Sequence, residues 1–90
     1  PKEIEDVLAA HPHVSEVIAF GLPDREWGES VAVAIVRADE TLDEAAVLAF
    51  CLERLASFKK PKRVIFVPEL PRNAYGKVLR RMLKEEYGRP

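Results

Sequence analysis

The sequence has little of what covalent or metal-based stabilisation requires. Its only cysteine is Cys51, so the chain makes no internal disulfide bond, which fits a reducing cytoplasm. His11 and His13 are not joined by further cysteines or histidines at zinc-ligand spacing, and we expect no metal site. No apolar run is long enough to cross a bilayer, and the first residues lack the pattern of a secretory leader. We therefore expect a cytoplasmic chain without a membrane span.

Ninety residues are enough for one small domain with a modest core. The chain begins without methionine, and we expect it to be part of a longer polypeptide. Cys51 lies between Phe50 and Leu52, which predicts a buried helical position for this thiol more than a reactive one.

Charge is divided unevenly along the chain. The formal net charge is only −1, but residues 1–45 hold three basic and eleven acidic residues, whereas residues 46–90 hold eleven basic and four acidic residues. A basic half predicts an anionic partner. The alternative is that the two halves pair with each other in the fold, through exposed ion pairs that are individually weak.

Apolar periodicity and turn residues predict the order α-β-β-α-β-α. We expect an α+β fold with a small three-stranded sheet flanked by helices, in one domain over residues 1–90. The predicted strands cover residues 14–20, 31–36 and 64–67, and the continuous apolar run at 31–36 is typical of a central strand covered on both faces. The first helix is expected to end near His11, because Pro12 disfavours helix in the residue before it.

The second helix has a recognisable start signal. Thr41 and Glu44 have the spacing of a capping box, in which the threonine caps the helix. Leu48, Leu52 and Leu55 then predict the buried face of this helix.

A lysine near the end of the chain is the strongest candidate for chemistry. Pro71 and Gly76 frame a turn that holds Lys77, and a basic amphipathic helix is expected after it. A lysine on a turn presents its ammonium group away from any regular face, as a reaction at a phosphate requires. A phosphate-binding P-loop is excluded, because that motif needs Ser or Thr where this chain has Val78. The alternative is an ordinary solvated surface lysine.

Two aromatic residues define a second candidate site. Trp27, the only tryptophan, lies between two predicted strands, and Phe58 precedes a basic cluster that includes Lys60. An aromatic side chain beside basic residues suits a phosphorylated ligand with an apolar part. The alternative for Trp27 is a plug at the edge of the core.

Five segments in order give the chain a family resemblance. They are PKEIE at 1–5, HPHV at 11–14, GLPD at 21–24 with WGE at 27–29, FKKPK at 58–62, and LPRN at 70–73 with GKVLR at 76–80. Together they resemble the small C-terminal domain of adenylate-forming (AMP-binding) enzymes, and most of all that of acyl- and aryl-CoA synthetases. The likeness extends over essentially the whole chain.

The resemblance implies a role for each candidate residue. Lys77 would be the catalytic lysine of carboxylate adenylation, with Gly76 and Arg72 in the loop that meets the substrate phosphates. Trp27 and Phe58 would line the path of CoA, and Lys60 would lie near its phosphates.

The resemblance also implies co-substrates and partners. ATP and CoA would be co-substrates, Mg²⁺ would accompany ATP without binding to this domain, and the carboxylic acid would bind to a large N-terminal domain. The chain would rotate about a hinge relative to that domain, so that it takes part first in adenylation and then in thioester formation. Alone, the chain would be inactive. A lysine acetyltransferase and deacetylase are expected to act on Lys77, because acetylation removes its charge.

Two other functions remain open, one within the family that the chain resembles and one outside it. A nonribosomal adenylation domain tends to carry aspartate where this chain has Leu79, which favours the CoA ligase. A non-catalytic interaction module, such as one that binds nucleic acid, would use the basic second half, but the chain lacks an overall positive charge and an aromatic platform among the basic residues, so we expect no nucleic-acid partner.

Overall fold

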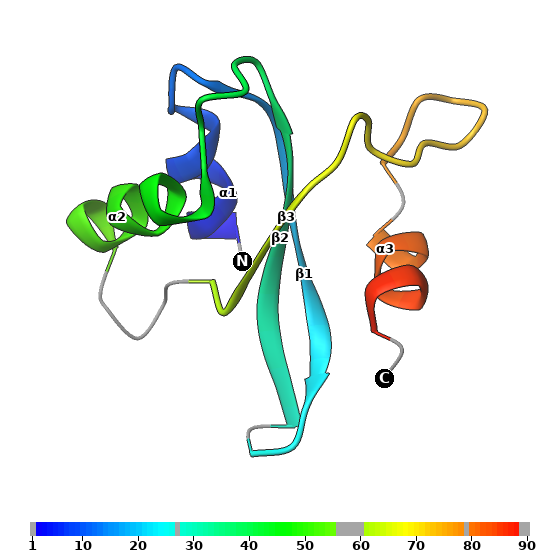
Figure 1. Cartoon of the computed structure of the whole chain (residues 1–90). Coiled ribbons are helices and arrows are strands. Elements are labelled where there is room, and N and C mark those ends of the chain that lie inside the picture. Colours follow the sequence, from blue (N-terminus) through cyan, green and yellow to red (C-terminus); the bar gives the residue numbers. More distant parts are fainter. Residues whose placement is uncertain (1, 27, 56–60, 79, 89–90) are drawn as a thin grey trace.

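The computed structural model describes residues 2–26, 28–55, 61–78 and 80–88. The helices are α1 (Lys2–Ala9), α2 (Glu44–Arg54) and α3 (Arg80–Tyr87), and the strands are β1 (Val14–Asp24), β2 (Gly28–Arg37) and β3 (Arg63–Phe66), as Figure 1 shows. Their order along the chain is α-β-β-α-β-α, which confirms the expected α+β class. No helix within the described ranges has the length and apolar content needed to span a bilayer.

The sheet has β2 at its centre. β1 pairs with β2 in antiparallel fashion through the hairpin, and β3 pairs with the other edge of β2 in parallel. Residues 32–35 of β2 are fully buried, as their continuous apolar run predicted. β2 is therefore the doubly covered central strand.

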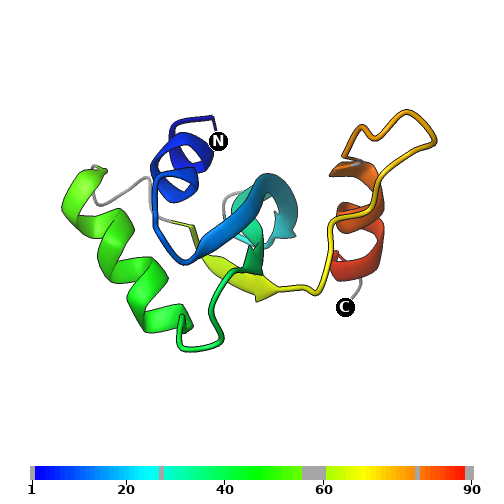
Figure 2. The same cartoon turned by 90° about the horizontal axis from the view of Figure 1, so that it is seen from above.

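Helices cover the sheet on both faces, with α1 and α2 on one and α3 on the other (Figure 2). Side chains alternate along a strand, so Val33 and Ile35 face α1 and α2, whereas Ala32 and Ala34 face α3. On the α3 side, Leu83 is the only residue of the helix that is buried. The sheet thus separates two small cores, and the one under α3 depends on a single helical side chain.

The start of α2 differs from the expected capping box. The helix begins at Glu44, and Asp43 is its N-cap, with the Asp43 carboxylate accepting a hydrogen bond from the Ala46 N–H at 2.8 Å. The Thr41 N–H instead donates to the Asp39 carboxylate. An aspartate caps a helix as well as a threonine does, so the two candidates could not be separated by type alone.

The buried face of α2 is also different from the leucine face that was expected. Val47 and Cys51 are fully buried, whereas Leu52 is 48% exposed. Val47 and Cys51 are four residues apart on one face of the helix, so the buried face is turned by one residue from the face that carries Leu48 and Leu52. The prediction of a buried Cys51 is confirmed, and burial raises the pKa of its thiol.

Side chains cover the outer edge of β1 at its middle, around Ala19. Ala19 lies on this edge, and its N–H donates to the Glu5 carboxylate of α1 at 2.7 Å. Its carbonyl accepts from the Nε of Arg80 of α3 at 3.0 Å, and Arg80 also bonds to the same Glu5 oxygen at 3.0 Å. One ion pair therefore satisfies both outward backbone groups and ties α1 to α3 around the edge.

Replacing Glu5 by alanine is expected to lower the free energy of unfolding by about 1–2 kcal/mol, because the Ala19 N–H and Arg80 lose a shared acceptor. Glu5→Gln should lose less, since it keeps an acceptor oxygen. The measurement is urea unfolding of the chain, with Arg81→Ala as a control for losing an exposed arginine beside Arg80. Equal stability of the Glu5→Ala and wild-type chains would show that the ion pair does not stabilise the edge.

Candidate functional site

The candidate lysine lies on a loop between β3 and α3 that projects from the body of the domain (orange in Figures 1 and 2). The two sides of this loop are joined by an isolated antiparallel bridge between Arg72 and Val78. Gly76 adopts a φ of +82°, a conformation that favours glycine over any residue with a side chain. We call residues 71–78 the lysine loop.

Asn73 organises the lysine loop. Its side-chain oxygen accepts hydrogen bonds from the N–H groups of Tyr75 and Lys77, at 2.9 and 3.0 Å. Its backbone N–H donates to the Lys77 carbonyl at 2.9 Å, and its carbonyl accepts from the Gly76 N–H at 3.0 Å. Four hydrogen bonds that meet on one residue fix the backbone on which Lys77 is presented.

Arg72, at the start of the lysine loop, connects this loop to the sheet. It donates to the Gly76 carbonyl at 2.8 Å and forms an ion pair with Glu16 of β1. In this structure its guanidinium therefore holds the loop against the sheet. A role toward substrate phosphates, which was expected for Arg72 and Gly76, stays a prediction.

The side chain of Lys77 is exposed, and among the described residues no ion pair includes it. This sets it apart from its cationic neighbours, since Arg72 and Arg80 both pair with carboxylates. The backbone of Lys77 is held while its ammonium group is open to an external anion.

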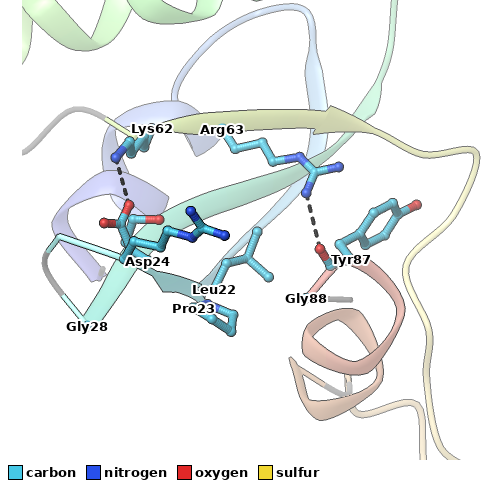
Figure 3. A pocket seen from close by; sticks show the side chains of 10 residues that line it. Leu22, Pro23, Asp24, Gly28, Lys62, Arg63, Tyr87 and Gly88 are labelled. Atoms are coloured by element: carbon cyan, nitrogen blue, oxygen red, sulfur yellow. Dashed lines mark hydrogen bonds and ion pairs between the residues drawn. The ribbon is translucent and has the colours of Figure 1, made fainter. Parts of the chain in front are cut away.

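A second concave region lies at the far end of α3. A pocket of about 760 Å³ opens between the end of the β1–β2 hairpin, the start of β3 and the end of α3 (Figure 3). Its polar lining includes Arg25, Lys62 and Arg63. Arg63 donates to the Tyr87 carbonyl at 3.1 Å, and its guanidinium lies 5.7 Å from the centre of the Tyr87 ring. We call this the hairpin pocket.

Lys62 is the most strongly held cation of the hairpin pocket. Its ammonium lies 2.6 Å from the carboxylate of Asp24, whose side chain is only 9% exposed. The hydrogen bond to Asp24 raises the pKa of Lys62, because it favours the charged ammonium. The lining thus combines fixed charge with the apolar surfaces of Leu22 and Pro23.

The predicted CoA-binding residues border this region in the sequence. Trp27 lies between Arg25 and Gly28, which both line the pocket, and Lys60 precedes Lys62 by two residues. Trp27, Phe58 and Lys60 themselves lie outside the described residues. Their role toward CoA remains a prediction.

The lysine loop and the hairpin pocket lie at opposite ends of α3. Lys77 precedes the helix, whereas Tyr87 ends it, and a helix of eight residues is about 12 Å long. The structure therefore brings together the residues of the lysine loop and keeps this loop apart from the hairpin pocket.

His11 lies two residues beyond the last residue of α1, in keeping with the expectation that the first helix ends near it. The helix α1 ends at Ala9, and the Nδ1 of His11 accepts a hydrogen bond from the His13 N–H at 3.0 Å. Burial lowers the pKa of His11, and the charges of His13 and Arg54 add to this effect. Across the described ranges, no three histidine, cysteine or acidic side chains are grouped to hold a metal ion.

The uneven charge of the chain is explained in part within the fold. Ion pairs between the two halves, counted over the described residues, are Lys62–Asp24, Arg72–Glu16, Arg80–Glu5 and Lys84–Glu29. Four cations of the basic half therefore pair with the acidic half and are less available to a nucleic acid.

Comparison with known proteins identifies the family. The chain matches the family described as the AMP-binding enzyme C-terminal domain over residues 3–77, and it belongs to that family. It is 49% identical over 88 residues to the long-chain-fatty-acid–CoA ligase FadD13 of Mycobacterium tuberculosis, covering 97% of this chain and 17% of that protein. It is 42% identical over 88 residues to the oxalate–CoA ligase of Arabidopsis thaliana, again covering 97% of this chain and 17% of the relative.

A solved structure has the same fold. MatB from Rhodopseudomonas palustris, crystallised with ATP, superposes with a TM-score of 0.92 at 47% identity, covering 98% of this chain and 18% of that one. The chain therefore spans less than a fifth of the length of these relatives.

Asn73 and Glu5 are the structural residues that the sequence analysis missed. An asparagine at the start of a turn, followed by glycine, is a signal for a side chain that bonds to the backbone two residues on, and it could have identified Asn73. Glu5 pairs with a residue 75 positions away, and no local pattern indicates such a contact.

We expect Asn73→Ala to loosen the lysine loop without unfolding the domain, because it removes the acceptor shared by two backbone N–H groups. Amide hydrogen exchange at Tyr75 and Lys77 should speed up by about tenfold or more, for the loss of bonds worth roughly 1–2 kcal/mol. Asn73→Asp keeps the acceptor and should retain the protection. Unchanged exchange in Asn73→Ala would show that the bridge and Gly76 hold the loop by themselves.

Proposed function

We propose that this chain is the mobile C-terminal domain of an ATP-dependent, AMP-forming carboxylic acid–CoA ligase. The observation that carries the proposal is the lysine loop, on which Lys77 has a fixed backbone and an exposed ammonium group that pairs with no carboxylate of the described residues. The family and the CoA-ligase relatives support this assignment over a carrier-protein-loading adenylation domain.

In the first half-reaction, a carboxylate oxygen attacks the α-phosphorus of ATP, an acyl-adenylate forms and pyrophosphate leaves. Two anions must approach each other, and negative charge spreads over the phosphoryl oxygens. Lys77 lies between the carboxylate and the phosphate in this proposal, where it offsets their repulsion and aligns them. Mg²⁺ accompanies ATP on the large domain, which also holds the acid.

In the second half-reaction, the CoA thiol attacks the acyl carbon and AMP leaves. The hairpin pocket has the lining for a phosphorylated ligand with apolar parts, and Trp27, Phe58 and Lys60 are its proposed extensions. Because the lysine loop and the pocket lie at opposite ends of α3, the domain turns between the two half-reactions. Such a rotation removes Lys77 from the site once its work is complete.

Replacing Lys77 by alanine in the full-length enzyme is expected to slow adenylate formation by roughly 10²–10³-fold, from the loss of about 3–4 kcal/mol of charge stabilisation. Stability should hardly change, because the side chain is exposed. Thioester formation from preformed acyl-adenylate should persist. The measurements are pyrophosphate release and CoA-thioester formation, each in single turnover.

Acetylated Lys77 should behave as the alanine variant does, because acetylation removes the same charge. This gives a lysine acetyltransferase and a deacetylase a direct means of control. Pyrophosphate release at the wild-type rate by Lys77→Ala would reduce Lys77 to a solvated surface lysine and overturn the proposed function.

Trp27→Ala in the full-length enzyme should impair thioester formation more than adenylation, because we assign Trp27 to the path of CoA alone. A selective loss marks an interaction that is used in one step. The ratio of the two half-reaction rates is the measurement, with thermal unfolding alongside. Equal losses in both rates together with a lower melting temperature would instead identify Trp27 as a plug of the core.

A further inference from the structure

Tyr75 is the most exposed large apolar side chain among the described residues. Its exposed fraction is 95%, compared with 48% for Leu52 and 46% for Met82. A single exposed aromatic residue is not unusual on a protein surface. What distinguishes Tyr75 is its place, two residues before Lys77 on the lysine loop.

The backbone that carries Tyr75 is held in position. Its N–H donates to the Asn73 side chain at 2.9 Å, and the next residue, Gly76, bonds to the Asn73 carbonyl. Arg72 fixes the loop to β1 through Glu16. A tyrosine on an ordered backbone has few torsions left to restrict on binding, which is what makes it effective as an anchor in interfaces.

Chain geometry forces Tyr75 to follow Lys77. The Cα atoms of residues two apart are separated by about 7 Å at most. If Lys77 reaches reactants that are bound by the large domain, Tyr75 is carried to the same region of that domain in the same movement. When the domain turns to present the hairpin pocket, at the other end of α3, Tyr75 must leave with Lys77.

We infer that Tyr75 is an aromatic anchor that docks on the large domain of the same enzyme in the adenylation state alone. The inference rests on the proposed function. The partner of Tyr75 in this inference is the large domain. The relatives have room for such a domain, since this chain covers only 17–18% of their length. We place the docking surface near the phosphates of ATP, because Tyr75 lies two residues from Lys77. A contact made in one state and lost in the other shifts the balance between the half-reactions.

The test measures both half-reactions of the full-length enzyme in single turnover. Tyr75→Ala should slow adenylate formation by about tenfold, a typical result of truncating an interface aromatic. Thioester formation from preformed acyl-adenylate should change by less than about twofold, and Tyr75→Phe should recover most of the adenylation rate because it keeps the ring. Leu52→Ala, which truncates an exposed apolar residue on α2, is the matched control and should leave both rates alone.

Lys77→Ala is measured in parallel, so that the two proposals can fail separately. If Lys77→Ala stops adenylation and Tyr75→Ala does not slow it, the anchor is wrong and the proposed function stands. If Lys77→Ala has no effect, the proposed function itself is wrong. Equal loss in both half-reactions for Tyr75→Ala overturns state-specific docking. A change in oligomeric state with unchanged rates would assign Tyr75 to contacts between copies, which also overturns it.

Discussion

Burial of β2 on both faces is the constraint on which the rest of the domain depends. A strand with apolar side chains on both sides needs cover on both sides, and the described part of the chain supplies three short helices for it. Two of them cover one face, so α3 alone covers the other and contributes a single fully buried side chain. The position of α3 then determines where the lysine loop and the hairpin pocket lie, because each is built on one end of that helix.

Because α3 buries a single side chain, polar contacts at its two ends also hold the helix to the sheet. Arg80 holds its beginning to Ala19 and Glu5, and the carbonyl of Tyr87 at its end accepts from Arg63. These contacts fix the ends of α3, on which the lysine loop and the hairpin pocket are built, and leave Lys77 exposed. The uneven charge of the sequence is consistent with this arrangement, because cations of the second half form ion pairs with acids of the first half.

Much of the fold followed from local patterns, and the differences have local causes. The continuous apolar run at 31–36 identified the central strand because both faces of β2 are buried. The start of α2 was misplaced because Thr41 and Asp43 are both good caps, and only the path of the chain into the helix decides between them. For the site, the sequence indicated Lys77 through its turn residues. The support from Glu5 and Glu16 could not be predicted, because ion pairs between residues so far apart depend on the finished topology.

The closure of the β1 edge has a consequence for how the chain is made. Ala19 leaves the ribosome 61 residues before Arg80, so β1 and β2 can pair long before the side chain that covers their outer edge exists. During that interval, the hairpin presents unpaired backbone groups on which another nascent chain can add a strand. Glu5, which is made first, already occupies the Ala19 N–H and places a carboxylate on the edge. Glu5 of α1 can thus block strand addition at Ala19 during synthesis, before Arg80 is made and completes the ion pair.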